Sequence, residues 1–295
     1  RLPPGMHHAR VPPKGRFTSG TVNFLHIPKT GGISVEGMTS RIIRGLKKAG
    51  VRTTEACWPA FRRGSKNGTA NIISIRSPRS HVLSLYLECV YSPWGAGTRN
   101  GGFPMEVSTG KGFARWVTHF SGTDWRLRGG DFGCYNPISM QTRALTCRGG
   151  GFGSSHHWGK TALPSLGGAV SALREMDVLV LTDMLPESAC LLTYRLRGHL
   201  PKTCDCKAAQ YAAGISIPHE THKVPPHIPM SFAVDEEVWR HVDRLVATDI
   251  QLYRVALDRF WADLRAVEAQ TGRQLLCEDR VAKLCNNTAY IDGLW

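Results

Sequence analysis

Apolar residues along this chain gather in four short runs that are typical of β-strands. The clearest run is Ala-Asn-Ile-Ile-Ser-Ile at 70–75, which is apolar enough to lie inside a sheet and is stopped by Arg-Ser-Pro at 76–78. The other three runs occupy 21–26, 51–57 and 177–182. The pattern therefore predicts four strands, three of them in the first 75 residues.

Between and after these runs, apolar residues recur at the spacing of a helix. In the segment 34–49 they are Val35, Met38, Ile42, Ile43 and Leu46. Further helices are predicted at 80–91 and 185–196, and a long amphipathic helix or helix pair at 235–269. Strands and helices in this order predict an α/β fold, a single domain in which a central, mostly parallel sheet is flanked by helices.

The domain organisation is indicated by the segments in which apolar residues recur neither at the spacing of a strand nor at that of a helix. Residues 1–20 are rich in Pro, Gly and basic side chains and are predicted to form a flexible N-terminal tail. Residues 21–295 are predicted to form one domain. Within it, the Gly-rich stretch 92–168 is expected to hold long loops and short helices around the functional site, and 199–230 is expected to be irregular.

The chain is strongly basic. It contains 37 Lys and Arg against 23 Asp and Glu, a formal net charge of +14. Such an excess attracts polyanions, which include nucleic acid, acidic lipid, acidic polysaccharide and phosphate-rich cofactors. Net charge does not choose among them, and a basic surface without a specific anionic partner remains an alternative.

The nine cysteines and two glycosylation acceptors favour an oxidising, secretory compartment. The acceptors are Asn67-Gly-Thr and Asn286-Asn-Thr. Loop-flanked cysteine pairs such as Cys134/Cys147 and Cys277/Cys285 point the same way, and the odd count leaves at least one thiol unpaired within the chain.

Metal binding and membrane insertion are both less favoured. The spacer in Cys204-Asp-Cys206 is too short for a zinc knuckle, and His219-Glu-Thr-His222 lacks one residue of the H-E-x-x-H motif. No stretch of about 18 uninterrupted apolar residues occurs. Membrane association is therefore expected only through an anchor outside this chain.

The segment from His26 to Ser34 (HIPKTGGIS) joins a predicted strand to a predicted helix. A helix start offers unpaired N–H groups and the positive end of the helix dipole, so it binds anions. Gly31 and Gly32 allow close backbone approach, Lys29 supplies a charge, and Thr30 and Ser34 supply hydroxyl donors. A simple glycine turn is the alternative. The segment is not a Walker A loop, because Lys29 precedes the glycines, and no G-x-G-x-x-G fingerprint occurs.

This motif closely resembles the 5′-phosphosulfate loop of the Golgi carbohydrate sulfotransferases, in the branch of the heparan sulfate 2-O- and 6-O-sulfotransferases. A second segment, 72–86 (IISIRSPRSHVLSLY), resembles the strand–loop–helix with which that family holds a 3′-phosphate. By this match Arg76 and Ser84 would hold the 3′-phosphate, with Arg79 as a helper. Arginine suits this role through its planar fork of donors.

The resemblance covers roughly 21–270 and is strong at these two motifs. Weaker matches follow the family's order at 136–145, 178–188 and 249–253. It implies a P-loop kinase-like sulfotransferase fold and 3′-phosphoadenosine 5′-phosphosulfate (PAPS) as co-substrate, with no metal required. It also implies a carbohydrate acceptor, acidic polysaccharides included, with no role for nucleic acid, and a location in the Golgi lumen.

The same resemblance assigns catalytic roles. Lys29 would stabilise the charge that develops on the departing phosphate oxygen. The 2-O and 6-O branches use a His between the two motifs as general base, but the chain has no His from Gly32 to Ile72. Glu55, at the end of the second predicted strand, matches the position of a glutamate base in other sulfotransferases. Glu36 is expected to be structural.

Other residues and functions remain open at this point. Histidines of the middle region are an alternative source of the base, and basic residues there are candidates for binding an acidic acceptor: His119, His156 and His157, then Arg115, Arg143 and Lys160. A catalytically inactive glycan-binding protein and a sulfotransferase for a small-molecule or lipid acceptor are the competing functions. A nucleotide kinase would require the missing Walker A loop.

Overall fold

The computed structural model describes residues 20–46, 49–64, 70–99, 101–106, 110–121, 132, 134–147, 163–208 and 234–291. The predicted N-terminal tail lies outside the described residues, apart from Gly20, which opens the first strand. The statements below concern the described residues.

The strands form one four-stranded sheet in the order β2-β1-β3-β4, with every neighbouring pair parallel. Their bounds are Gly20–Leu25 (β1), Ala49–Thr54 (β2), Ala70–Ile75 (β3) and Val178–Leu181 (β4). The predicted α/β fold with a mostly parallel central sheet flanked by helices is thus confirmed, and the bounds of β3 agree with the prediction at both ends.

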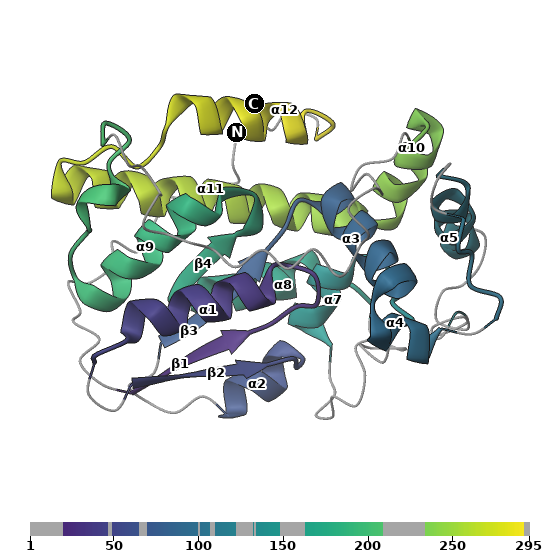
Figure 1. The fold of residues 1–295 in the computed structure, drawn as a ribbon, viewed down its shortest axis with the longest axis horizontal. Helices are drawn as coiled ribbons and strands as arrows, with labels where there is room; N and C mark the ends of the chain where they lie inside the picture. The colour runs from purple at the N-terminus through teal and green to yellow at the C-terminus, as the bar shows by residue number, and fades with distance from the viewer. Residues whose placement is uncertain are drawn as a thin grey trace.

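Eleven described α-helices surround this sheet (Figure 1). They are α1 (Gly32–Ile43), α2 (Trp58–Gly64), α3 (Pro78–Tyr91), α4 (Pro93–Thr98), α5 (Lys111–Ser121), α7 (Met140–Thr146), α8 (Leu166–Glu175), α9 (Leu185–Arg197), α10 (Glu236–Leu245), α11 (Ala247–Thr271) and α12 (Glu278–Thr288). A 3₁₀ turn, η2 (Thr182–Met184), follows β4, and another, η3 (Lys202–Cys204), follows α9.

Two predicted helices differ in extent from the observed ones. The helix predicted at 34–49 ends at Ile43, because Gly45 adopts a left-handed φ of 86° and turns the chain toward β2. The segment 235–269 is a helix pair that breaks at Val246, whose φ and ψ of −110° and 21° lie outside the helical region.

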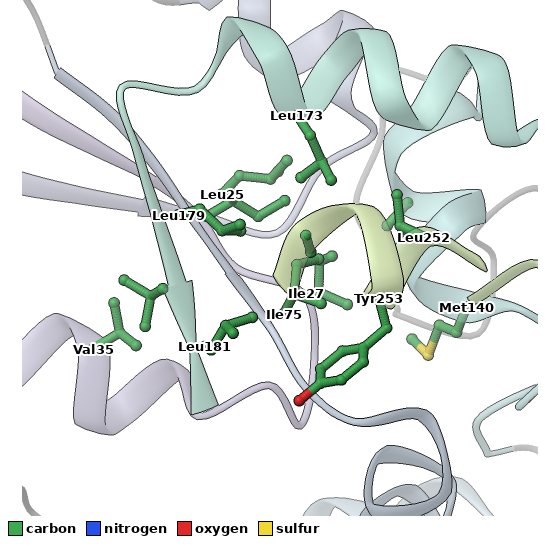
Figure 2. Close-up of a cluster of buried hydrophobic side chains, with 14 of the residues drawn as sticks. Leu25, Ile27, Val35, Ile75, Met140, Leu173, Leu179, Leu181, Leu252 and Tyr253 are labelled. Carbon is green, nitrogen blue, oxygen red and sulfur yellow. The ribbon is translucent and has the colours of Figure 1, made fainter. Parts of the chain in front are cut away.

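The core lies on both faces of the sheet. Helices α1 and α9 pack together, and Figure 1 shows both in front of the strands while α11 runs along the upper side. Behind them, Leu25, Ile75 and Leu179 gather with Leu173 of α8 and Leu252 of α11 (Figure 2). Burial of apolar side chains such as these is the main favourable contribution to folding.

Four disulfides cross the fold, at Cys57–Cys147, Cys89–Cys134, Cys190–Cys204 and Cys206–Cys277. The neighbouring pairs suggested by the sequence, Cys134/Cys147 and Cys277/Cys285, are therefore not disulfide partners. Cys134 and Cys147 flank α7, and each reaches a different element. The odd thiol predicted from the count is Cys285.

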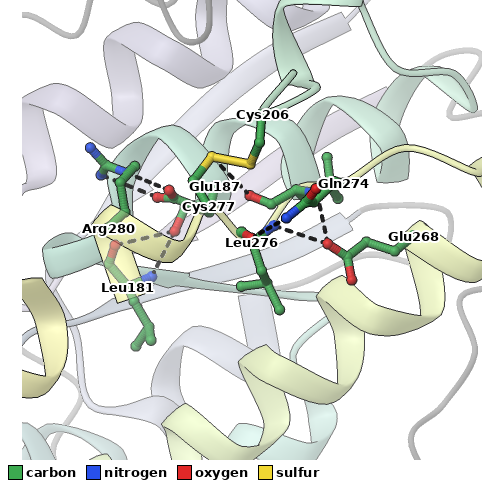
Figure 3. A network of polar contacts seen from close by, with 10 residues as sticks. Leu181, Glu187, Cys206, Glu268, Gln274, Leu276, Cys277 and Arg280 are labelled. Atoms are coloured by element: carbon green, nitrogen blue, oxygen red, sulfur yellow. Dashed lines mark hydrogen bonds and ion pairs between the residues drawn. A yellow bond between two sulfur atoms is a disulfide. The ribbon is translucent and has the colours of Figure 1, made fainter. Parts of the chain in front are cut away.

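The C-terminal segment is fastened to the domain by a polar network (Figure 3). Arg280 of α12 forms an ion pair with the fully buried Glu187 of α9. Glu268 accepts from the backbone N–H groups of Leu275 and Leu276 at 2.7 and 2.9 Å. The Cys206–Cys277 disulfide closes the same region, so α12 is held by covalent, ionic and backbone contacts together.

Asp249 connects α11 to α7. Its buried carboxylate accepts hydrogen bonds from the Gln141 N–H at 3.1 Å, from the Thr142 N–H at 2.7 Å and from the Thr142 hydroxyl at 2.7 Å. These amides belong to the first turn of α7, where the side chain of the local cap residue Ser139 donates to the Leu245 oxygen and makes no capping bond. Asp249 therefore caps α7 from another helix. Burial raises the pKa of Asp249 to about 6, against the opposing effect of the Thr142 hydrogen bonds.

Replacing Asp249 with Asn places an NH₂ group against amide donors, so Asp249→Asn should lower the free energy of unfolding by about 2 kcal/mol at pH 7. Between about pH 4 and 6 the folded protein keeps a proton on Asp249 that the unfolded chain releases. The advantage of the wild type should therefore shrink as pH rises through this window.

Urea unfolding followed by tryptophan fluorescence at several pH values measures both effects. Glu237→Gln, which changes an exposed carboxylate of the preceding helix α10, is the matched control. A variant as stable as the wild type at pH 7, or a difference that grows with pH, would contradict this account of Asp249.

Candidate functional site

The carboxyl ends of the four parallel strands bring polar residues to one edge of the sheet. His26 follows β1, Glu55 follows β2, Arg76 follows β3 and Thr182 follows β4. In open α/β sheets, ligands bind at this edge. The residues predicted from the two sequence motifs therefore follow the adjacent strands β1 and β3, at the edge where a ligand is expected.

The loop from Pro28 to Gly31 is turned so that its carbonyl groups face the protein. His81 Nε2 lies 2.8 Å from the Pro28 carbonyl oxygen, Arg76 donates to the Lys29 oxygen at 3.1 Å, and Thr182 donates to the Thr30 oxygen at 2.6 Å. Three consecutive carbonyls are thus bound by side chains of other elements.

The amide groups of the following residues are left for a ligand. The first helical hydrogen bond of α1 runs from the Val35 N–H to the Gly31 oxygen at 3.0 Å. The N–H groups of Gly32 and Ile33 have no acceptor within the described part of the chain. They lie at the positive end of the α1 dipole, so the loop forms a cradle for an anion.

The two glycines of the loop serve different purposes. Gly31 has a left-handed φ of 82°, which other residues adopt at a cost. At Gly32 the reason is space, since an added Cβ would lie 2.0 Å from His26 Nε2. Gly32 therefore allows the imidazole ring of His26 to rest on the first residue of α1.

Thr30 and Ser34 are both buried. Thr30 was expected to offer its hydroxyl to the anion. Instead the hydroxyl donates to the Ile27 oxygen at 2.8 Å and lies 2.7 Å from the Ser74 hydroxyl of β3. Thr30 therefore fixes the loop to the neighbouring strand, while Ser34 lies in the first turn of α1.

Lys29 is held by an ion pair. Its Nζ lies 2.7 Å from Glu88 Oε2 of α3, and the exposed fractions of the two side chains are 8% and 16%. Glu88 lies on the same face of α3 as His81, which contacts Pro28. Ser84 falls between them at helical spacing, so this face of α3 brings Ser84 against the loop. Lys29 also has a left-handed φ of 67°, a strained conformation for a non-glycine residue.

Arg76 is positioned through its own backbone. The side-chain amide of Gln141 accepts from the Arg76 N–H and donates to the Arg76 carbonyl, both at 2.9 Å. Burial lowers the pKa of the Arg76 guanidinium, and the carboxylate of Asp183 opposes this shift. Asp183 also binds the N–H and the hydroxyl of Ser77 at 2.8 and 2.7 Å, at the start of α3.

These contacts involve the downstream segments singled out in the sequence. Gln141 lies in 136–145, Asp183 in 178–188 and Asp249 in 249–253. Asp249 binds α7, α7 presents Gln141, and Gln141 holds Arg76. The downstream segments therefore supply the contacts that hold the second motif in position.

The Arg79 side chain contacts residues of α10 and the ring of Tyr290. It binds Asp243 through two hydrogen bonds of 2.9 and 2.6 Å, and its guanidinium lies over the rings of Trp239 and Tyr290 at 5.3 and 4.2 Å. Glu236 adds an ion pair at 3.3 Å. Arg79 thus joins α3 to α10 and to Tyr290, instead of turning toward a second phosphate as the sequence suggested.

The acidic candidates have distinct partners. Glu55 Oε1 lies 3.0 Å from Nδ1 of His26. Glu36 accepts from the hydroxyl of Thr53 at 2.8 Å, which agrees with the structural role expected for it. The sequence interpretation assigned no role to His26. The usable signal was its place directly after β1, in register with the residue directly after β2.

The alternative residues of the middle region are distributed more widely. His119 packs on Phe132 and Phe120 within an aromatic cluster. Arg115 is exposed and pairs with Glu106 at 3.4 Å. Arg143 is buried and donates to the carbonyls of Ile138 and Asn136, so it is unavailable to an acceptor. The remaining candidates lie outside the described residues: His156, His157 and Lys160.

Among the described residues no group of three or more His, Cys, Asp or Glu could hold a metal ion. Cys204 and Cys206 each belong to a disulfide, while His219 and His222 lie outside the described part. None of the described helices has the length and apolar character that crossing a membrane requires.

Comparisons of the chain with protein-family models, with curated proteins and with solved structures found no match. The functional reading therefore depends on the geometry above and on the motifs of the sequence.

The close approach of His26 and Gly32 can be tested by Gly32→Ala. The new Cβ would collide with the imidazole, so this variant should lose about 1–3 kcal/mol of unfolding free energy. Gly167→Ala, in the first turn of α8, adds the same methyl group where nothing lies within 4 Å and should be neutral or stabilising. Urea unfolding compares them, and equal stability of the two variants would contradict the placement of His26.

Proposed function

We propose that this protein is a sulfotransferase that moves a sulfuryl group from PAPS to a hydroxyl group of a carbohydrate. The observation that carries the proposal is that two segments with groups suited to binding anions follow adjacent parallel strands. The loop after β1 offers amides and Lys29, and the segment after β3 offers Arg76 and, from α3, Ser84. The resemblance of both motifs to carbohydrate sulfotransferases supports the same function.

The donor carries two separate anionic groups, and the two elements match them. In the proposed complex the 5′-phosphosulfate lies at the amides of Gly32 and Ile33 beside Lys29, and the 3′-phosphate lies at Arg76 and Ser84. The Ser84 hydroxyl has no partner among the described residues. Nucleoside triphosphates carry consecutive phosphates at one end, so they would not satisfy both elements.

In the proposed reaction the acceptor oxygen attacks sulfur and the bond between sulfur and the 5′-phosphate oxygen breaks. The hydroxyl proton passes to a base at the site, where Glu55 and its partner His26 lie, and 3′-phosphoadenosine 5′-phosphate (PAP) departs. Lys29 and the loop amides would stabilise the charge on the departing oxygen. The proposal includes no metal ion, because these groups supply the positive charge themselves.

The finer assignments are part of the same proposal. A loop between the first strand and a helix of a parallel sheet fits the P-loop kinase-like sulfotransferase fold. Four disulfides, and the exposed Asn286 of a glycosylation acceptor, fit the Golgi lumen. A carbohydrate is the proposed acceptor, and nucleic acid is not.

Calorimetric titration with PAP, run beside ATP and ADP, tests the donor site. The wild type should prefer PAP, and Arg76→Ala should weaken PAP binding roughly ten- to a hundredfold, because a charged hydrogen bond contributes about 1.5–3 kcal/mol. Arg76→Lys keeps the charge but loses the fork, so it should fall between the two. Arg62→Ala, an exposed residue on α2, controls for net charge.

Two results would contradict the proposed sulfotransferase function. One is a wild type that binds PAP no better than ADP. The other is an equal loss of affinity in Arg76→Ala and Arg62→Ala. Either result would favour a polyanion-binding protein without a specific donor.

The Lys29–Glu88 pair gives a second prediction. An anion at the loop meets the Glu88 carboxylate and competes with it for Lys29, so Glu88→Gln should tighten PAP binding by on the order of tenfold. Glu106→Gln removes the same charge from an exposed pair and should leave the affinity unchanged. Weaker PAP binding in Glu88→Gln would show instead that the carboxylate is needed to place Lys29.

A further inference from the structure

His26, the first residue of the loop segment, forms a pair with Glu55, which lies in neither sequence motif. They are the first residues beyond β1 and β2, and the His26 N–H continues the ladder by donating to the Thr54 oxygen at 3.0 Å. The two side chains therefore leave adjacent strands in register. His26 Nδ1 lies 3.0 Å from Glu55 Oε1, and the exposed fractions of the side chains are 20% and 40%.

The imidazole ring is fixed on three sides. Glu55 lies at Nδ1, the ring of Phe24 stacks at 5.6 Å between centroids, and Gly32 lies against the ring face at Nε2. The three ring atoms nearest to a Cβ built at Gly32 are Nε2 at 2.0 Å, Cδ2 at 2.4 Å and Cε1 at 2.5 Å. The ring face at Nε2 therefore lies against Gly32, the first residue of α1, where the proposed anion cradle begins.

This arrangement determines the tautomer of neutral His26. A carboxylate accepts only, so Nδ1 must carry the proton and donate it to Glu55. Nε2 is then left with its lone pair, in the plane of a ring whose face lies against Gly32 at the start of the cradle. A histidine whose Nδ1–H is held by a carboxylate and whose Nε2 faces the reacting atoms has the geometry of a general base with its positioning residue.

We infer that His26 Nε2 takes the proton of the attacking hydroxyl, and that Glu55 acts as a positioning residue that orients the ring and stabilises the imidazolium. The inference rests on the proposed sulfotransferase function and replaces Glu55 as the atom that receives the proton. The acceptor oxygen bonds to sulfur, its proton moves to Nε2, the sulfur–oxygen bond to the 5′-phosphate breaks, and PAP leaves. No other co-reactant is needed.

The test uses water as the acceptor, so that it does not depend on knowing the carbohydrate. Release of labelled sulfate from ³⁵S-PAPS is measured for the wild type, His26→Ala, Glu55→Gln and the double variant, with PAP titrations of each protein beside it. His26→Ala should slow sulfate release about a hundredfold or more, the range for loss of a general base. Glu55→Gln should slow it about tenfold, and the double variant should be no slower than His26→Ala.

Imidazole added to the buffer should restore part of the activity of His26→Ala, because the space beside Gly32 is open in that variant. It should not restore Glu55→Gln, whose histidine is still present. This readout separates a proton acceptor from a residue that only supports the loop. Should His26→Ala fail to fold, His26→Gln keeps a side chain over Gly32 and serves in its place.

Several outcomes overturn the inference while leaving the donor site intact. They are a larger loss in Glu55→Gln than in His26→Ala, no rescue by imidazole, or a wild type that binds PAP and releases no sulfate above the buffer rate. A wild type that does not bind PAP overturns the proposed function itself, and the role of His26 with it.

Discussion

The three hydrogen bonds that turn the carbonyls of residues 28–30 into the protein are the interactions on which the rest of the site depends. A left-handed φ at Lys29 disfavours this loop by about 1–2 kcal/mol, so local preference alone would not maintain it. The donors are Arg76 directly after β3, His81 of α3 and Thr182 of η2, all far from the loop in sequence. The conformation of the loop therefore depends on tertiary contacts, to which the loop itself adds its permissive glycines and the Thr30 hydroxyl.

The donors themselves need support, because each is a polar group at the edge of an apolar core. Burial lowers the pKa of His81 to about 3, and the nearby Arg76 and Lys29 act in the same direction, so His81 is neutral and donates through Nε2 to Pro28. Arg76 is held through its backbone by Gln141, which is presented by a helix that Asp249 caps. Buried polar groups are tolerated only when bonded, so this succession of contacts fixes the site and links it to α11.

The sequence was informative where one local rule dominates. The strand at 70–75 was predicted with its observed bounds because apolar residues and a following proline act together there. The first helix was predicted too long, since apolar spacing continues past Gly45 while the backbone turns at that residue. The loop residues from Lys29 to Gly32 were identified through their order, whereas the burial of Thr30 was not, because it depends on Ser74 of another strand.

Long-range pairing could not be predicted in the same way. Nothing in the spacing shows that Lys29 meets Glu88, that Arg79 meets Asp243, or that Cys57 reaches Cys147. The His26–Glu55 pair is an intermediate case. Both residues follow predicted strands directly, so a parallel register would have brought them together, but the register was known only once the strand order was established.

The hydrogen bonds that the arginine side chains make change how the net charge of the chain should be interpreted. Several of them neutralise no ligand and donate instead to backbone carbonyls at helix ends and turns: Arg99, Arg143, Arg195, Arg197, Arg259 and Arg273. A formal charge of +14 therefore overstates the positive surface open to a polyanion. The charge that matters for the proposed donor lies in two side chains, Lys29 and Arg76, and in a few amides. The net charge therefore does not favour an acidic polysaccharide over a neutral carbohydrate as the proposed acceptor.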